Sequence, residues 1–208
     1  MSTAPPRVAV LDGGTGNLRS VAAAIARAGG RAEVVTTPAA ARRAQALVVP
    51  GVGAFDTGIR ALRATGLDGV ISDFAAHGRP VLGVCLGMQL LHEGSEEGSL
   101  PGLGLLSGRA RRLPAGGSVK VPHMGWNRVH WTAPHPYVDA IPQGTRFYFV
   151  HAYAVPPGPS AVGESSHGAP FAAACASGSV FATQFHPERS GAAGLVLYRS
   201  LVEAARCW

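Results

Sequence analysis

Apolar runs and amphipathic stretches alternate along the first part of the chain. The run Arg7–Asp12 predicts a strand, and Asn17–Ala28 predicts an amphipathic helix because apolar residues recur at positions 18, 21, 22 and 25. Strands alternating with helices at this spacing indicate a parallel sheet covered on both faces. Further strands are expected over Ala32–Thr36, Ala46–Val49 and Pro80–Val84, with helices over Pro38–Gln45 and up to His77.

The pattern changes after Leu103, where Pro and Gly interrupt strand-like runs and helical periodicity is weak. A final helix is expected over Gly191–Ala205, with apolar residues along one side. No internal repeat or linker is evident, so residues 1–208 are interpreted as one α/β domain with an added antiparallel layer. The strand-like runs are Ser118–Val121, Arg128–Trp131, Arg146–Tyr153, Phe171–Ala176 and Val180–Phe185.

Composition favours a globular protein. Charged residues make up 14% of the chain, against about 25% in typical domains. The net charge is +6, but the arginines are scattered and only Arg109, Arg111 and Arg112 cluster. No aromatic stacking pattern accompanies them, so a solvated strand face or a protein contact is expected there, and no nucleic-acid partner.

Membrane insertion, secretion and metal binding are also not expected. No apolar run approaches the roughly 20 residues of a membrane span, and the N-terminus lacks the features of a signal peptide. Cytoplasmic residence is therefore predicted. Cys85, Cys175 and Cys207 are odd in number and lack metal-ligand spacing, which argues against a disulfide framework or a metal site.

The sharpest chemical signal is GVCLG at positions 83–87, between an aliphatic strand and the helix-like MQLLHE. This setting is that of a nucleophile elbow with a thiol in place of a hydroxyl. Because the tight turn leaves no room two residues either side of Cys85, both places take Gly. The helix N-terminus favours the thiolate, and the Leu86 amide is expected to bind an oxyanion. A buried structural cysteine is an equal alternative on these residues alone.

A thiolate nucleophile needs a base and a group to orient that base. Among the eight histidines, His186 follows a strand and has Glu188 two residues on, with Pro187 between them. His92 adjoins Glu93, but its place on the helix after the nucleophile predicts that it points elsewhere. The alternative is that His186 and Glu188 only pair with each other in a surface turn. Taken together with the elbow at Cys85, a catalytic role is favoured.

Two glycine-rich loops follow predicted strands. In PGVG at positions 50–53, two glycines flank one residue, so the amides of Gly51 or Val52 are candidates for a second oxyanion donor. Taken alone this signal is weak, since many such loops look alike. GGTG at positions 13–16 lacks the full G-x-G-x-x-G spacing, so no dinucleotide cofactor is expected, and no other cofactor is indicated.

Cys85 in GVCLGMQLL, with His186 and Glu188 in QFHPE, resembles the class I glutamine amidotransferases. Other segments resemble one branch of that family, the glutaminase subunits of imidazole glycerol phosphate synthase, over nearly the whole chain. These segments are DGGTGNLRSV (12–21), PGVGAF (50–55), KVPHMGWN (120–127), FYFVHAY (147–153) and QFHPERS (184–190). The resemblance implies a flavodoxin-like, mostly parallel sheet flanked by helices, with an added layer of antiparallel strands.

The resemblance also implies a reaction. Cys85 attacks the side-chain carboxamide of glutamine, His186 handles the protons, and Glu188 orients His186. Ammonia leaves, and water releases glutamate from the thioester on Cys85.

Further site residues follow from the same resemblance. The amides of Leu86 and of Gly51 or Val52 stabilise the oxyanion, while Gln89 and Glu97 bind the substrate. From spacing alone, Gln89 would be a helix-face residue and Glu97 part of a solvated acidic run, so their roles depend on the resemblance.

A chain of this length with one such site has no second domain to consume ammonia, so a partner is expected. The resemblance implies a (β/α)8-barrel cyclase subunit that receives the ammonia and forms imidazole glycerol phosphate and AICAR in histidine biosynthesis. Asn17, Lys120, Trp126 and Tyr148 match family positions near that interface. Lys120 is the only lysine, which chance could also explain, and for Trp126 and Tyr148 burial in the core is a comparable alternative.

Three other functions remain open at this point. A free-standing cysteine hydrolase would need no partner, and a non-catalytic interaction module would retain the fold without the chemistry. Another amidotransferase subunit would feed a different synthase, although KVPHMGWN argues against it. The paired glycines of PGVG also suggest that the isolated chain holds an oxyanion amide in the wrong direction until a ligand-bound cyclase joins it.

Overall fold

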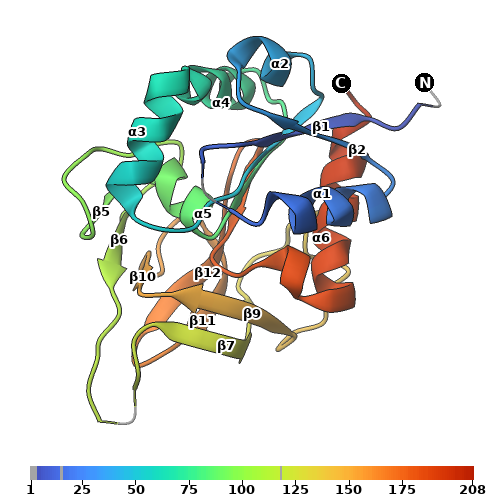
Figure 1. Cartoon of the computed structure of the whole chain (residues 1–208). Coiled ribbons are helices and arrows are strands. Elements are labelled where there is room, and N and C mark those ends of the chain that lie inside the picture. The colour runs from blue at the N-terminus through green and yellow to red at the C-terminus, as the bar shows by residue number, and fades with distance from the viewer. Residues whose placement is uncertain (1–3, 15, 118) are drawn as a thin grey trace.

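The centre of the molecule is an eight-stranded sheet (Figure 1). The computed structural model describes residues 4–14, 16–117 and 119–208, so Thr15 of the predicted loop and Ser118 of a predicted strand lie outside it. In spatial order the strands are β2 (Arg31–Val35), β1 (Arg7–Leu11), β3 (Ala46–Val49), β4 (Val81–Val84), β13 (Val180–Thr183), β12 (Pro170–Ser177), β11 (Ala161–Ser166) and β8 (His130–Trp131).

The first five strands of this order are parallel, and the last three join antiparallel. The parallel order, with β1 between β2 and β3, is that of the flavodoxin-like fold. The predicted mostly parallel sheet is therefore confirmed. The antiparallel strands differ from the prediction in one respect: three of them extend the main sheet, while others form separate small sheets.

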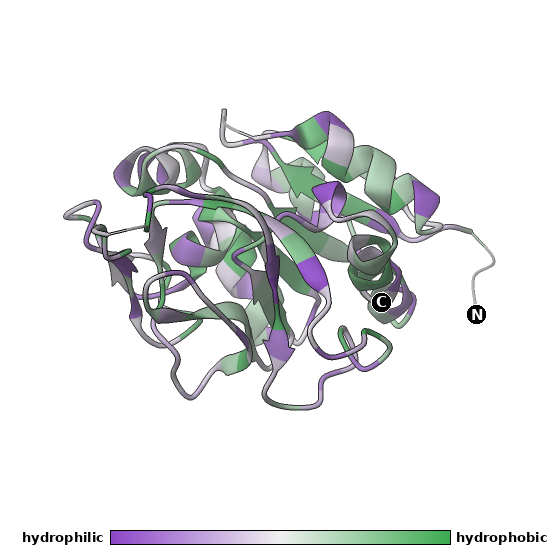
Figure 2. Cartoon of the chain, turned by 90° about the horizontal axis from the view of Figure 1, so that it is seen from below, coloured by the Kyte–Doolittle hydropathy of each residue, from purple (hydrophilic) through white to green (hydrophobic). Residues whose placement is uncertain are grey.

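Helices cover both faces of the sheet (Figure 1). Residues alternate along β1, so Val8 and Val10 pack toward one helical layer while Ala9 and Leu11 pack toward the other. This double burial is why the strands read as continuous apolar runs, and Figure 2 shows hydrophobic residues concentrated along them. One layer holds α1 (Leu18–Arg27) and α6 (Gly191–Ala205); the other holds α2 (Pro38–Arg42), α3 (Phe55–Thr65), α4 (Leu67–Ala76) and α5 (Leu86–Leu91).

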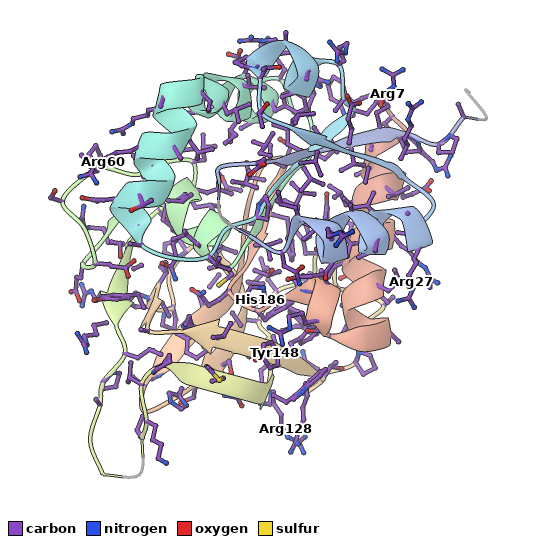
Figure 3. The ribbon with its side chains drawn as sticks, in the orientation of Figure 1. Arg7, Arg27, Arg60, Arg128, Tyr148 and His186 are labelled. Carbon is purple, nitrogen blue, oxygen red and sulfur yellow. The ribbon has the colours of Figure 1, made fainter. Side chains whose placement is uncertain are left out.

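Two small sheets lie outside the main one. β7 (His123–Arg128) pairs antiparallel with β9 (Arg146–His151). β6 (Arg109–Arg112) lies between β5 (Gly94–Ser95) and β10 (Tyr153–Ala154). The arginines of β6 are exposed, as expected for a solvated strand face. Figure 3 shows other arginines on widely separated parts of the surface, which fits the scattered charge of the sequence.

Several element boundaries differ from the prediction. The predicted strand Ser118–Val121 is wrong, because Val119 forms only an isolated bridge with Gly116 and the positive φ angles of the neighbouring glycines break the extended path. The predicted strand Arg128–Trp131 is interrupted at Val129, whose N–H turns to the carbonyl of Thr145.

The predicted strand Arg146–Tyr153 is also divided, at Ala152, whose carbonyl accepts from Leu113 N–H. The helix-like MQLLHE ends at Leu91, so His92 is its C-cap and takes an extended backbone.

Candidate functional site

Cys85 lies at the carboxyl end of β4, where the chain turns sharply into α5. Its φ of 55° is the only positive one among the non-glycine residues that the structure describes. A Cβ added at Gly83 would lie 2.7 Å from Leu91 Cδ1, and one added at Gly87 would lie 2.7 Å from the carbonyl carbon of Val49. Backbone atoms therefore leave no room for a side chain at Gly87, while at Gly83 a Cβ would be crowded by the Leu91 side chain and by the Met88 backbone at 3.1 Å. The positive φ of Cys85 marks a candidate functional position.

The second part of the site comes from β13, the parallel neighbour of β4. Because parallel strands end at the same edge, the residues after β13 meet the elbow: Cys85 N–H donates to Thr183 O at 2.8 Å. His186 follows, and Nδ1 of its ring lies 2.8 Å from Oε1 of Glu188 on the short 3-10 turn Pro187–Arg189. The two side chains are 6% and 2% exposed, so a surface turn pair is excluded.

The imidazole of His186 favours its charged form. Burial lowers the pKa of His186, but the Cys85 sulfur and the Glu188 carboxylate outweigh burial and raise it to about 10. Because Glu188 occupies Nδ1, the nitrogen left for the thiol is Nε2, which is buried and makes no hydrogen bond to a described residue. The arrangement can hold an imidazolium beside a thiolate and can return a proton from Nε2.

Gln184 is a site residue that the sequence analysis did not single out. It is fully buried, and its Nε2 donates to Cys85 Sγ at 3.8 Å. Its Oε1 accepts from Gln89 Nε2 at 3.0 Å. The available signal was its position: Gln184 precedes His186 by two residues in an extended segment, where alternate side chains share a face.

A pocket of about 500 Å³ opens beside Cys85. It brings together several predicted site residues, since Leu86, Gln89, Glu97 and Val52 line it. The amide of Gln89 donates to Tyr153 O at 2.9 Å, and Glu97 Oε2 accepts from the N–H of Phe55 at 2.9 Å. The remaining lining residues are Gly53, Ala54, Val150, His151, Ala152 and Tyr153.

The two predicted oxyanion donors meet each other in this structure. The N–H of Leu86 donates to the carbonyl oxygen of Gly51 at 3.3 Å. The N–H of Leu86 is therefore already occupied, and the carbonyl of Gly51 points toward it. Gly53, with a φ of 99°, ends the same loop in a conformation that suits glycine.

The four predicted interface residues lie outside the pocket. Trp126 is 54% exposed, so burial of its side chain in the core is excluded. Tyr148 is half-buried, packs edge-to-face on Trp126 at 6.2 Å, and carries the guanidinium of Arg189 over its ring at 4.1 Å. Figure 3 shows Tyr148 next to His186, whose ring centroid is 6.5 Å away. Asn17 precedes α1 and Lys120 precedes β7, both exposed.

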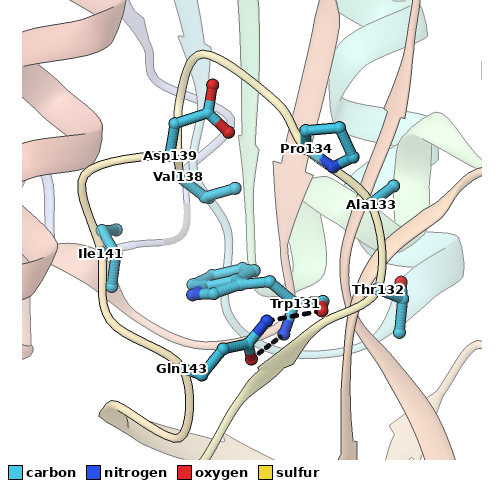
Figure 4. Close-up of a pocket in the computed structure, with 8 residues that line it drawn as sticks. All are labelled: Trp131, Thr132, Ala133, Pro134, Val138, Asp139, Ile141 and Gln143. Atoms are coloured by element: carbon cyan, nitrogen blue, oxygen red, sulfur yellow. Dashed lines mark hydrogen bonds between the residues drawn. The ribbon is translucent and has the colours of Figure 1, made fainter.

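A second cavity, of about 370 Å³, lies under the loop after β8 (Figure 4). The indole of Trp131 forms its floor, and the amide of Gln143 is hydrogen-bonded to both backbone groups of Trp131 at 2.8 Å. Its one ionisable lining residue, Asp139, already accepts from the N–H of His135. This cavity contains no predicted site residue and no arrangement for acid–base chemistry.

Within the described ranges, no three His, Cys, Asp or Glu side chains converge as metal ligands would. In the same ranges, every helix is too short or too polar to cross a bilayer.

Comparisons with known proteins identify similar sequences over nearly the whole chain. A family model described as glutamine amidotransferase class-I matches residues 9–200. "Imidazole glycerol phosphate synthase subunit HisH" of Synechococcus sp. (strain JA-3-3Ab) is 45% identical over 201 residues, covering 95% of this chain and 93% of the relative. The protein of the same name from Thiobacillus denitrificans is 47% identical over 206 residues, covering 94% and 90%.

Solved structures share the fold at lower sequence identity. The structure of PurLQS from Thermotoga maritima superimposes with a TM-score of 0.73 at 21% identity, covering 96% of this chain and 98% of that one. A structure described as a glutamine amidotransferase has a TM-score of 0.73 at 23% identity, covering 96% and 98%.

Proposed function

This chain belongs to the class-I glutamine amidotransferase family, and within it to the HisH subunits of imidazole glycerol phosphate synthase, and on that premise we propose that it hydrolyses glutamine and supplies the ammonia to a cyclase subunit. The proposed activity is that of a glutaminase in histidine biosynthesis, carried by residues 1–208 as one amidotransferase domain. The observation that supports it best is the buried pair of His186 and Glu188 beside the strained thiol of Cys85.

The proposed reaction passes through a thioester. Cys85 Sγ attacks the side-chain carboxamide carbon of glutamine, and the proton it has given up resides on His186 Nε2. That proton goes to the departing nitrogen, which leaves as ammonia. A water then attacks the thioester carbon and gives a proton to Nε2, and glutamate departs as the thiol is restored. Glu188 holds the ring through Nδ1 during both halves of the reaction.

The pocket suits the α-ammonium group of glutamine. Both hydrogens of the Gln89 amide are used, on Tyr153 O and on Gln184 Oε1. The atom that Gln89 can offer a substrate is therefore its Oε1, an acceptor. The carboxylate of Glu97 adds a second acceptor at the same pocket. Two acceptors, one of them charged, complement an ammonium group.

The structure corresponds to a resting state in this proposal. As long as the carbonyl of Gly51 accepts from Leu86 N–H, the tetrahedral oxyanion has no donor from Leu86 and meets a carbonyl oxygen from the loop. Rotation of the peptide after Gly51 would turn the N–H of Val52 inward and release Leu86 N–H. Docking of a ligand-bound cyclase would favour that rotation, which keeps ammonia from being released without a consumer.

The proposed docking surface is the outer face of β7 and β9. It carries the exposed side chains of Met124 and Trp126 together with Tyr148. Tryptophan and tyrosine are the residues most enriched among those that dominate binding energy at interfaces. The proposed partner is the cyclase, a (β/α)8 barrel, with Asn17 and Lys120 contributing from neighbouring loops.

The proposal is tested by replacing the thiol. Cys85→Ala is expected to abolish glutamate release and glutamine-driven cyclisation by the complex, while cyclisation driven by added ammonium salt continues at the wild-type rate. Cys175→Ala, at a buried thiol on β12, is the matched control and should retain both rates. Glutamine-driven activity in Cys85→Ala would refute the proposal. A lone chain as fast as the complex would refute the resting state.

A further inference from the structure

The inner face of β7 begins a continuous series of hydrogen bonds. Asn127 Nδ2 donates to Ser166 O at 2.9 Å and to His123 Nε2 at 3.3 Å, while its Oδ1 accepts from Arg128 N–H at 2.8 Å. These partners fix the orientation of the amide, because the two hydrogens of Nδ2 and the oxygen are all engaged. His123 Nε2 is consequently an acceptor, and the proton of this neutral ring lies on Nδ1.

That proton continues the series to the catalytic pocket. His123 Nδ1 donates to His151 Nε2 at 3.0 Å, and His151 Nδ1 donates to Tyr153 O at 2.9 Å. Each bond thus sets the tautomer of the next ring. Burial, with smaller contributions from neighbouring histidines, lowers the pKa of His123 to about 4 and that of His151 to about 3. Both rings are therefore neutral near pH 7, as the series requires.

The series reaches the sulfur through two glutamines. Tyr153 O also accepts from Gln89 Nε2 at 2.9 Å. The other hydrogen of that amide goes to Gln184 Oε1 at 3.0 Å, and Gln184 Nε2 donates to Cys85 Sγ at 3.8 Å. Tyr153 O, Gln89 and Gln184 are thus joined in sequence to Cys85 Sγ. A shift of one of these groups would lengthen its hydrogen bond to the next.

The other face of β7 is the proposed docking surface. Side chains alternate along the strand, so His123 and Asn127 face inward while Met124, 64% exposed, and Trp126 face outward. β9 is the one strand hydrogen-bonded to β7 in the described sheets, and Figure 1 shows this pair at the side of the molecule away from the chain ends. Trp126, on the proposed docking surface, and His123, on the inner face, therefore belong to the same strand.

We propose that His123 and Asn127 are positioning residues that connect docking on β7 to the placement of Gln89 and Gln184 around Cys85. The inference rests on the proposed function, because it takes Cys85 as the nucleophile and the outer face of β7 as the docking surface. Packing alone does not require these polar atoms. His123 is stacked against Phe149 at 5.0 Å and against His167 at 4.2 Å, which a phenylalanine ring could reproduce.

The test uses the full chain with its cyclase, and imidazole glycerol phosphate as the cyclase ligand. His123→Phe keeps an aromatic ring and removes both nitrogens, and Asn127→Ala breaks the first bond of the series. Each is expected to reduce the ligand-stimulated kcat for glutamine about tenfold, with KM changed less than about twofold. His123→Asn, whose amide nitrogen can stand in for Nδ1, should recover most of the stimulation. His130→Phe on the exposed strand β8 is the matched control.

Several readouts separate the possible failures. Ammonium-driven cyclisation and calorimetric affinity for the cyclase should match wild type in every variant, which shows that each folds and docks. If His123→Phe and Asn127→Ala are stimulated as strongly as wild type, the inference is overturned. If the wild-type complex itself releases no glutamate from glutamine, the proposed function fails instead.

A spectroscopic measurement tests the series in the wild-type chain alone. Nitrogen-15 shifts of the imidazoles should show the Nδ1–H tautomer for both His123 and His151 at pH 7. An Nε2–H tautomer at His123 would overturn the inference even if the variants fail to fold.

Discussion

Gly87→Ala should test the geometry of the elbow directly. The new Cβ would lie 2.7 Å from the carbonyl carbon of Val49 and nearer still to its oxygen. Carbon atoms pack best at about 3.5–4.0 Å. Both atoms belong to backbone, so the conflict cannot be relieved by a side-chain rotation. The chain at Val49 and Pro50 must move by roughly 1 Å or more, given that contact distance.

This displacement has two expected costs. Overpacking of a buried site typically destabilises by about 1–3 kcal/mol, and a backbone obstacle places Gly87→Ala at the upper end of that range. For a chain of this length, about 3 kcal/mol corresponds to a fall in Tm of roughly 6–12 °C. The moved segment also leads into the loop of Gly51, and a misplacement of about 1 Å near reacting groups costs about a hundredfold in rate.

Thermal unfolding and glutamate release by the complex measure the two effects. The control is Gly69→Ala in the first turn of α4, where an added Cβ meets no atom within 4 Å. That substitution should raise stability by up to about 1 kcal/mol through helix propensity alone. A Gly87→Ala variant with wild-type Tm and wild-type glutamine turnover would show that the elbow is not held against Val49 as described.

Three further predictions concern the partner surface and pH. Trp126→Ala should weaken affinity for the cyclase by about tenfold or more in calorimetry; an unchanged affinity would remove this side chain from the interface. Burial lowers the pKa of His186, while Cys85 and Glu188 raise it to about 10. In Glu188→Gln the imidazolium should lose its proton at lower pH, so the basic limb of the glutamine pH–rate profile moves to lower pH; an unmoved limb contradicts the pairing. Burial lowers the pKa of His123 and His151, so these histidines take up protons in the unfolded chain at a higher pH than in the folded chain. Tm should therefore fall as the pH drops from 6.5 toward 4, and it should fall less steeply in His123→Asn. A constant Tm over this pH range would refute the buried neutral rings.

Elements with a strong local pattern could be predicted from sequence. The run Ala46–Val49 and the helix Gly191–Ala205 have the predicted bounds, because each buries a contiguous or regularly spaced apolar set. The elbow at Cys85 was also predictable. The glycine spacing around Cys85 is a local motif, although the atoms that crowd Gly87 belong to Val49 and Pro50 at the end of another strand.

The pairing of β4 with β13 could not be predicted from the hydrophobic periodicity of the sequence. The two residues joined by the bond from Gln184 to Cys85 are 99 positions apart in the chain, and no local pattern reports that contact. The sequence indicated that a base was needed and that His186 had a carboxylate nearby. It did not indicate a second polar side chain on the sulfur, because the two-residue spacing of Gln184 and His186 places them on one face but does not show which atom either side chain contacts.

β7 was missed for a different reason. Its apolar side chains, Met124 and Trp126, face outward, while the polar His123 and Asn127 face the interior. This alternation is the reverse of the usual one, in which apolar residues face the core. Sequence alone therefore left open whether Trp126 belonged to the core or to an interface, and the 54% exposure of its side chain excludes the core.

The place of β13 between β4 and β12 has a consequence for synthesis of the protein. Strands β1 to β4 and the helix after the elbow are complete at residue 91, whereas β13 begins at residue 180. A ribosome-bound chain of intermediate length therefore has Cys85 but neither His186 nor Gln184, and one edge of its sheet is open. Long-range strand insertion of this kind is slow and leaves that edge prone to aggregation. Under the proposed function, the nascent polypeptide would gain its glutaminase activity only when translation is nearly finished.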